Sequence, residues 1–306
     1  MLEIKVDLEA QGGYRGLGDA ITFSWLAETA KQQDKTFRFF TDNPAKIKLL
    51  SLFNQNRLDN RDDTISTAFH YQQELDRLGR PSRLDILKEL LGVTDCANVR
   101  PGQQISPKSL QWADQTYLKI SQDKYKFVML FPGANFSSRQ YPANYWCCLA
   151  WELFGKGIPC AVFDTAYSEM LEKFPLWFYG VEMEDLAALV KRADLVVGND
   201  SFPAHLSGTL GTPALVLLGP TNPQVYRYLP DVRTLSSDRI DCSGCHFGPP
   251  FRSVCDLGCL SLYRLFPEEV LGAIFDILKP PLFDNDAKEY LRPQSNEKNT
   301  ASNNSK

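Results

Sequence analysis

The sequence lacks an excess of positive charge, a long apolar run and a targeting segment. Lysine and arginine number 33 against 37 aspartates and glutamates, a net charge of −4, so the basic field that nucleic-acid binding needs is missing and nucleic acid is not an expected partner. No apolar run approaches the roughly 18 residues that span a bilayer, so at most peripheral membrane contact is expected. The first ten residues, MLEIKVDLEA, lack the order of a signal peptide, which predicts a cytoplasmic protein.

Three common nucleotide-binding and hydrolase motifs are also missing. After the first expected strand, residues 13–18 read GYRGLG, which is not the GxGxxG order of a dinucleotide-binding loop and disfavours a dehydrogenase. The GxSxG and GxxxxGK patterns do not occur, which argues against a serine hydrolase and a P-loop enzyme.

The chain has the length and the apolar content for two packed domains. It has 306 residues, 43% of them hydrophobic, and domains usually take roughly 100 to 200 residues each. Apolar stretches that alternate with amphipathic helical patterns predict an α/β fold with parallel sheets covered on both faces; they span residues 4–8, 37–40, 127–131, 160–163, 195–198 and 214–218. We predict an N-terminal domain over 1–120, a C-terminal domain over 125–279 and a disordered tail over 282–306. The N-terminal domain is expected to be reduced, because no strong strand is evident between 64 and 91.

The densest chemical signal lies in residues 193–223. A buried strand is expected to end at Asn199, with Asp200 and Ser201 at the start of the next helix and His205 one turn further on. A second tight loop follows at 219–221. Ligands of open parallel sheets bind at this carboxyl edge, so these residues form a candidate binding site. The alternative is a helix cap and a packing histidine.

Residues 199–223, NDSFPAHLSGTLGTPALVLLGPTNP, resemble the donor-binding signature of glycosyltransferase family 9, the ADP-heptose:lipopolysaccharide heptosyltransferases and their relatives. GLGDAI at 16–21, FPGANFSSRQYPANYW at 131–146 and the segment 242–270 follow in the family's order, and the resemblance covers residues 3–279. It implies the GT-B architecture, in which two Rossmann-like domains face a cleft. It also implies an inverting, metal-independent glycosyltransferase. The enzyme would move a sugar, most plausibly heptose, from an ADP-heptose-like donor to a hydroxyl of a cell-envelope glycolipid or another glycan. Any peripheral membrane contact would be at the inner membrane face.

The resemblance also implies residue roles. Asp19 would be the general base that takes the proton of the acceptor hydroxyl, with a helix cap as the alternative. Arg139 would bind the donor phosphates, with a solvated surface arginine as the alternative. The predicted donor-binding set is Gly18, Gly133, Ser137, Ser138, Arg139, Asp200, Ser201, His205, Gly219, Pro220 and Thr221. Alternatives of other classes are a noncatalytic nucleotide-sugar or glycan-binding protein and an epimerase; the latter is disfavoured because the chain has only three histidines.

Phe202 and the short N-terminal half depart from the family's usual pattern, and the cysteine-rich insertion needs an explanation of its own. Phe202 stands where the family usually has glycine, and its ring either stacks on the donor or faces the core. The insertion 242–259 carries Cys242, Cys245, Cys255 and Cys259, a set of thiolates that suits a structural zinc or iron site, with reduced free cysteines as the alternative. No cofactor is expected for catalysis.

Overall fold

The computed structural model describes residues 2–9, 16–62, 64–66, 82–93, 97–121, 126–166, 168–239, 244–245 and 259–279. The predicted tail, Cys242 and Cys255 lie outside these residues. No described helix is long and apolar enough to cross a membrane.

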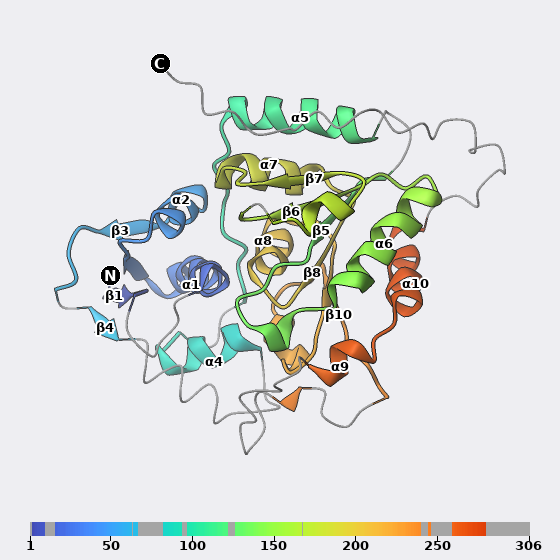
Figure 1. The fold of residues 1–306 in the computed structure, drawn as a ribbon. Helices are drawn as coiled ribbons and strands as arrows, with labels where there is room; N and C mark the ends of the chain where they lie inside the picture. The colour runs from blue at the N-terminus through green and yellow to red at the C-terminus, as the bar shows by residue number, and fades with distance from the viewer. Residues whose placement is uncertain are drawn as a thin grey trace.

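The N-terminal sheet is parallel and has the strand order β3-β2-β1-β4 (Figure 1). Its strands are β1 (Leu2–Asp7), β2 (Lys35–Phe40), β3 (Asn56–Leu58) and β4 (Ile65–Ser66), and its helices are α1 (Leu17–Ala30), α2 (Pro44–Leu52) and α4 (Arg83–Leu90). Asn43 accepts hydrogen bonds from two amides of the first turn of α2, and Pro44 fits that turn because it needs no amide donor.

The second sheet is also parallel and has the order β10-β9-β8-β5-β6-β7. Its strands are β5 (Val128–Phe131), β6 (Cys160–Asp164), β7 (Trp177–Tyr179), β8 (Leu195–Asn199), β9 (Ala214–Leu217) and β10 (Val232–Leu235). Chain order reverses between β5 and β8, so these two neighbouring strands form the topological switch point where a doubly wound sheet binds its ligands.

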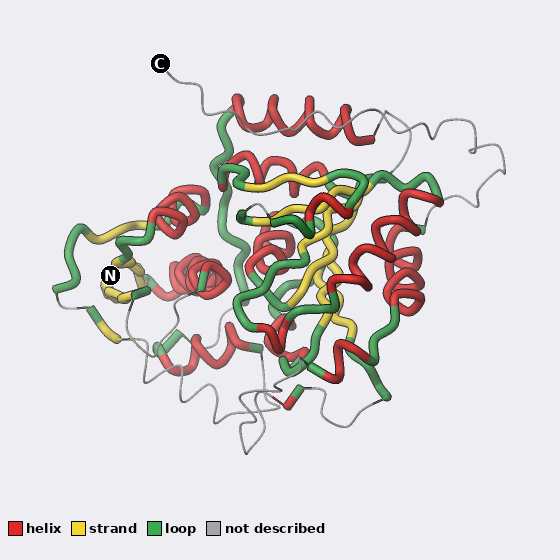
Figure 2. Tube along the Cα trace, in the orientation of Figure 1, coloured by secondary structure: helices red, strands yellow, loops and turns green. Residues whose placement is uncertain are grey.

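Helices cover both faces of the second sheet (Figures 1 and 2). Alternate residues of β5 point to opposite faces: Val128 and Leu130 pack with α6 (Ala143–Gly155) and α10 (Pro267–Leu278), whereas Met129 and Phe131 belong to the core on the other face. That other face carries α7 (Met183–Arg192) and α8 (Phe202–Leu210). The layers confirm the predicted α/β class with parallel sheets.

The two sheets are joined through helices. Helix α1 packs against α8, and one continuous apolar core includes Ile21 and Leu26 of α1 together with Leu206 of α8. Helix α5 (Pro107–Ser121) packs against α7 on the outer side of the second sheet, although the predicted boundary places most of α5 with the N-terminal domain. The boundaries at 120 and 125 and the reduction of the N-terminal domain stay predictions.

Candidate functional site

The loops that follow β5 and β8 are tied together by Asn199 at the end of β8. Its side-chain amide donates to the Pro132 carbonyl at 2.6 Å, and its Oδ1 accepts the Tyr141 amide at 3.0 Å. Asn199 is fully buried, so both bonds are shielded from water. The two loops that bear most of the predicted donor-binding residues therefore have a fixed relative position.

Asp200 directly follows Asn199, and its carboxylate contacts side chains of the protein. The hydroxyls of Thr221 and Tyr226 donate to it, and Arg139 Nε lies 3.2 Å from its Oδ2. Burial alone would raise the pKa of Asp200, but the charge of Arg139 and the two hydrogen bonds outweigh burial and hold the pKa below its ordinary value. Burial and this carboxylate raise the pKa of Tyr226 well above its ordinary range. Asp200 is thus an ionised anchor for Arg139 and the Thr221 loop.

Arg139 comes from the short 3-10 turn η2 (Ser137–Arg139) after β5. Its side chain is 20% exposed, and its guanidinium carbon lies 5.3 Å from the centre of the exposed Phe136 ring. Asp200 engages Nε, and no described residue contacts the two terminal nitrogens through an ion pair or hydrogen bond. Ser137 is exposed and Ser138 half-buried in the same turn. Arg139 can therefore hold Asp200 and still present donors outward.

The start of α8 carries a buried polar atom, the Ser201 hydroxyl oxygen. Ser201 precedes the helix in an extended conformation, and its hydroxyl makes no capping bond. The Ser201 Oγ atom is buried and has no hydrogen-bond partner in the described part of the chain. Phe202 is half-buried and packs against the core that joins the two sheets, so the structure favours the core orientation of its ring. Pro203 has no amide donor and the Ala204 amide bonds to the Ser201 carbonyl, so Phe202 supplies the backbone amide at this helix start. The start of a helix favours an anion.

The third predicted loop, at Gly219, Pro220 and Thr221, is buried and closely packed. A Cβ atom at Gly219 would lie 2.7 Å from the Cys259 sulfur, and the Gly219 carbonyl accepts the Gly244 amide at 2.9 Å. The Cys259 sulfur and the backbone of Gly244, the neighbour of Cys245, therefore meet at the same glycine. Among the described residues no group of three or more histidine, cysteine or acidic side chains could hold a metal.

Asp19 lies in the first turn of α1 at the opposing domain. Its Oδ2 accepts the Gly16 amide at 2.8 Å, which is the helix-capping contact, and its Oδ1 accepts from Arg83 Nη1 at 2.9 Å. The Asp19 side chain is 19% exposed and that of Arg83 is 10% exposed. Arg83 begins α4, which contacts the 3-10 turn η4 (Pro223–Tyr226) of the second domain. The carboxylate is thus held in one orientation near the domain contact.

His205 joins the two halves of the site. Its ring lies against Tyr226, with centroids 4.8 Å apart, and its Nδ1 is 2.8 Å from the Tyr228 hydroxyl. A Cβ atom at Gly18 would lie 2.7 Å from the His205 ring carbon Cδ2, so only glycine allows α1 this close to α8. Burial and the charge of Arg83 lower the pKa of His205 to about 3.

Replacing Gly18 by alanine should lower the free energy of unfolding by about 1 to 3 kcal/mol, because the new methyl group would push α1 away from a histidine that Tyr228 and Tyr226 hold in place. Urea unfolding measures the loss. The matched control is Gly272→Ala in α10, where a Cβ meets nothing within 4 Å; it should gain about 0.5 to 1 kcal/mol. Equal effects of the two substitutions would contradict the close packing of Gly18.

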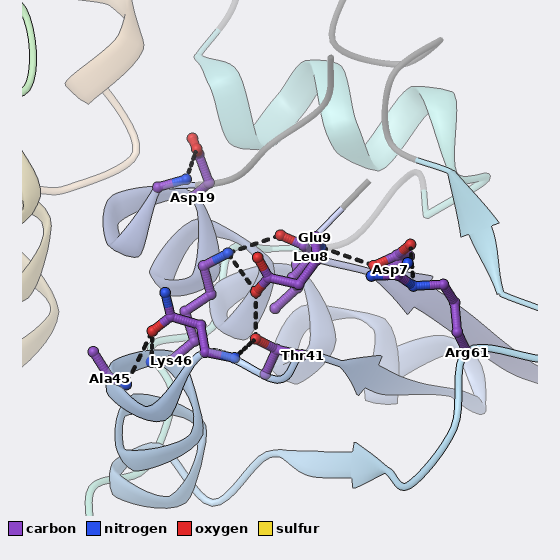
Figure 3. A network of polar contacts seen from close by, with 10 residues as sticks. Asp7, Leu8, Glu9, Asp19, Thr41, Ala45, Lys46 and Arg61 are labelled. Atoms are coloured by element: carbon purple, nitrogen blue, oxygen red, sulfur yellow. Dashed lines mark hydrogen bonds and ion pairs between the residues drawn. The ribbon is translucent and has the colours of Figure 1, made fainter. Parts of the chain in front are cut away.

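A separate polar network fixes the end of β1 (Figure 3). Lys46, only 1% exposed, donates to the Leu8 carbonyl at 2.8 Å and to Glu9 at 2.7 Å, and the Thr41 hydroxyl also donates to Glu9. On the strand's other flank, Arg61 pairs with Asp7. This network anchors the strand end from which the chain leads to Asp19.

Of the predicted residues, the structure brings Arg139, Asp200 and Thr221 into direct contact and places His205 against Gly18. Gly133 is set apart, facing Asp164 at the end of β6. A cavity of about 510 Å³ at the start of α6 contains no predicted site residue. Sequence reasoning missed four residues from three segments without a shared pattern: Thr22, Arg83, and the neighbouring Tyr226 and Tyr228.

Comparisons with known proteins give the family and the fold. A model of glycosyltransferase family 9 (heptosyltransferase) matches residues 84–247, more than half of the chain. No curated protein matches the sequence.

Three solved structures are similar in fold. A glycosyltransferase family 9 protein from Veillonella parvula has a TM-score of 0.63 at 19% identity, covering 91% of this chain and 97% of its own. ADP-heptose LPS heptosyltransferase II of E. coli has a TM-score of 0.60 at 14% identity, covering 91% and 99%. The dodecameric iron-containing heptosyltransferase TibC from enterotoxigenic E. coli, in complex with ADP-D-β-D-heptose, has a TM-score of 0.62 at 12% identity, covering 91% and 76%. These matches confirm the predicted GT-B fold class.

Proposed function

We propose, from the premise that the chain belongs to glycosyltransferase family 9, the heptosyltransferase family, that it transfers a heptose from an ADP-heptose-like donor to an acceptor hydroxyl with inversion at the anomeric carbon. One observation carries the proposal. The carboxylate of Asp19, held by Gly16 and Arg83, lies at the start of α1, and α1 packs on α8. The start of α8 carries the buried Ser201 hydroxyl, which has no hydrogen-bond partner among the described residues. The acceptor would be a cell-envelope glycolipid or another glycan, met by peripheral contact at the membrane.

The donor diphosphate would bind at the start of α8. Three kinds of hydrogen-bond donor would meet the phosphate oxygens there: the Phe202 amide, the unpartnered hydroxyl of Ser201 and the terminal nitrogens of Arg139. Thr221 already donates to Asp200, so Thr221 and Asp200 would act by holding Arg139 and the loop in place. Charge that develops on the departing diphosphate would be stabilised by groups that need no reorganisation, without a catalytic metal.

The base would be Asp19. As the acceptor oxygen bonds to the anomeric carbon, its proton passes to the carboxylate, and the bond to the diphosphate oxygen breaks with its electron pair leaving on the nucleoside diphosphate. Inversion requires the base on the face opposite the leaving group. The capping contact with Gly16 is compatible with this role, because a carboxylate has about four acceptor positions and Gly16 and Arg83 take only one each.

The assay that tests the proposal measures ADP release from ADP-heptose with and without a glycan or glycolipid acceptor. We expect acceptor-dependent release. Binding of ADP-heptose with no release under any acceptor would favour the noncatalytic binding protein, and acceptor-independent conversion of the sugar would favour an epimerase. Absence of binding would overturn the donor assignment.

Replacing Arg139 by glutamine should weaken ADP binding by about 10- to 100-fold, because charge-assisted hydrogen bonds to phosphate contribute about 1.5 to 3 kcal/mol. Calorimetric titration with ADP measures the change. The control is Arg239→Gln, since Arg239 also pairs with a carboxylate, that of Glu269, and lies over a phenylalanine ring, that of Phe266. Equal ADP affinities in the two variants would remove Arg139 from the phosphate site.

The cysteine insertion would hold a structural zinc or iron. The described part of the insertion fits this proposal, since the Cys259 sulfur and the residue before Cys245 both meet Gly219, and thiolates suit either metal. The bound metal would then stabilise the loop at Gly219 and would take no part in sugar transfer. Metal analysis of the purified protein and of Cys259→Ser tests this, and a metal-free, fully folded protein would contradict it.

A further inference from the structure

Three buried side chains form a chain of hydrogen bonds between α1 and α8. His205 Nδ1 lies 2.8 Å from the Tyr228 hydroxyl, and that hydroxyl lies 3.0 Å from Thr22 Oγ1. The Thr22 hydroxyl in turn donates to the Gly18 carbonyl at 3.1 Å. The chain therefore runs from the predicted donor-site histidine to the peptide that precedes Asp19.

The hydrogen bonds can be oriented by counting protons. Thr22 has one hydroxyl proton, and the Gly18 carbonyl can only accept, so Thr22 donates to Gly18 and accepts from Tyr228. Tyr228 then has no proton left for the imidazole and must accept from His205 Nδ1–H. The opposite orientation would lose the bond to Gly18, so it makes one hydrogen bond fewer.

We propose that Thr22 and Tyr228 fix His205 as the neutral Nδ1–H tautomer, so that its Nε2 accepts a hydrogen bond from a hydroxyl of the bound substrate. Tyr228 and Thr22 are positioning residues, and His205 is a specificity residue for a hydroxyl group. The tautomer is a property of the protein alone, whereas the hydroxyl contact rests on the proposed function.

The surroundings of His205 keep the ring neutral. It is 4% exposed, and burial and the charge of Arg83 lower its pKa to about 3, with Asp200 opposing and Arg139 reinforcing the shift. These three charged groups come from α4, the end of β8 and the turn after β5. A neutral ring with Nδ1 protonated has an unprotonated Nε2, which repels phosphate oxygens and accepts from hydroxyls.

The edge of the ring that carries Nε2 packs closely against Gly18, where a Cβ would lie 3.1 Å from Nε2. No described residue hydrogen-bonds to that nitrogen, so its acceptor position is left for a group that approaches from a side other than Gly18. The unpartnered Ser201 hydroxyl lies one helical turn earlier on α8. Two polar atoms without partners on neighbouring turns of one helix point to a polar ligand there.

The first test is nuclear magnetic resonance of the histidine ring nitrogens in the ligand-free protein, which is practical because the chain has only three histidines. His205 should show a protonated Nδ1 and an unprotonated Nε2, and its signals should not move between about pH 8 and about pH 5, whereas an ordinary histidine titrates near 6.5. The His205→Asn variant lacks the His205 ring-nitrogen signals and thereby assigns them. A protonated Nε2, or titration near the ordinary value, would overturn the proposal.

The second test asks whether Tyr228 and Thr22 set the tautomer. Tyr228→Phe and Thr22→Val should each add a detectable Nε2–H population, and the double variant should add no more than Tyr228→Phe alone. The control is Ser24→Ala, since Ser24 donates to the Ala20 carbonyl in the same helix without joining the chain; its spectrum should match the wild type. An unchanged tautomer in Tyr228→Phe would contradict the positioning role.

The hydroxyl contact is tested with deoxy analogues of ADP-heptose. In wild type, removing the recognised hydroxyl should weaken binding about 10-fold or more, and in His205→Asn the same removal should have little further effect. If every deoxy analogue lost as much affinity in His205→Asn as in wild type, hydroxyl recognition by His205 would be overturned. If ADP-heptose fails to bind at all, the donor assignment and the hydroxyl contact are both wrong, while the tautomer measurement still decides the state of His205.

Discussion

Replacing Asp19 by asparagine should lower the rate of sugar transfer about 10³-fold while leaving ADP binding nearly unchanged. Asparagine has the shape of aspartate and can still accept the Gly16 amide, so α1 should begin as before. It cannot take a proton from the acceptor hydroxyl. The loss should therefore appear in kcat, measured by acceptor-dependent ADP release, and should be absent from donor affinity.

The matched control for this substitution is Glu28→Gln in the same helix, where Glu28 pairs with Lys31 one turn away. It removes a carboxylate charge from α1 without touching the site and should keep the wild-type rate. Near-normal turnover by Asp19→Asn would remove the base assignment. Loss of ADP binding together with turnover would mean that Asp19 acts through folding or domain contact instead.

Replacing Asp200 by alanine should lower the free energy of unfolding by about 3 to 5 kcal/mol at neutral pH. The substitution leaves the Arg139 charge without its partner and the buried Tyr226 and Thr221 hydroxyls without their acceptor. Because the folded-state pKa of Asp200 lies below its ordinary value, its ionised form stabilises the fold above about pH 4, and this contribution is lost as the pH falls through the folded pKa. Urea unfolding at neutral pH measures the effect.

The control for Asp200 is Asp114→Ala, which breaks an exposed ion pair with Arg192. Exposed pairs contribute at most about 1 kcal/mol, so this variant should stay close to wild type. ADP affinity of Asp200→Ala should also fall, because Arg139 loses the contact that orients it. A stability within about 1 kcal/mol of wild type would show that the Asp200 cluster is not a buried anchor.

The sequence predicted the central strands and missed the edge strands. β1, β2, β5, β6, β8 and β9 each have a neighbour on both sides, and each matches a predicted apolar stretch. The four unpredicted strands, β3, β4, β7 and β10, are the edges of the two sheets. Central strands such as β5 are buried throughout, whereas β10 reads VRTL and is partly exposed. The edge strands β3, β4 and β10 therefore lack the continuous apolar run that marks a buried parallel strand. The edge strand β7 reads WFY, but it is only three residues long and partly exposed.

The residues of the candidate site likewise divide into those that the sequence could place and those that it could not. Asp200, Ser201 and His205 follow one strand directly, so local order was enough to place them at the sheet edge. Arg83 meets Asp19 because α4 packs on α1. Tyr228 meets His205 through tertiary packing in the second half of the chain, and no spacing in the sequence predicts either contact. Sequence also could not show that Asp200 faces protein groups, because that depends on Tyr226 being folded over it.

The central claim is that a donor diphosphate binds between the start of α8 and Arg139, opposite Asp19. A crystal structure of the protein with ADP-heptose bound tests it most directly. Diphosphate oxygens should lie about 3 Å from the Arg139 guanidinium and from the Phe202 amide or the Ser201 hydroxyl at the start of α8, with the anomeric carbon facing Asp19. A donor held elsewhere, with no contact to Arg139 or to the start of α8, would contradict the account.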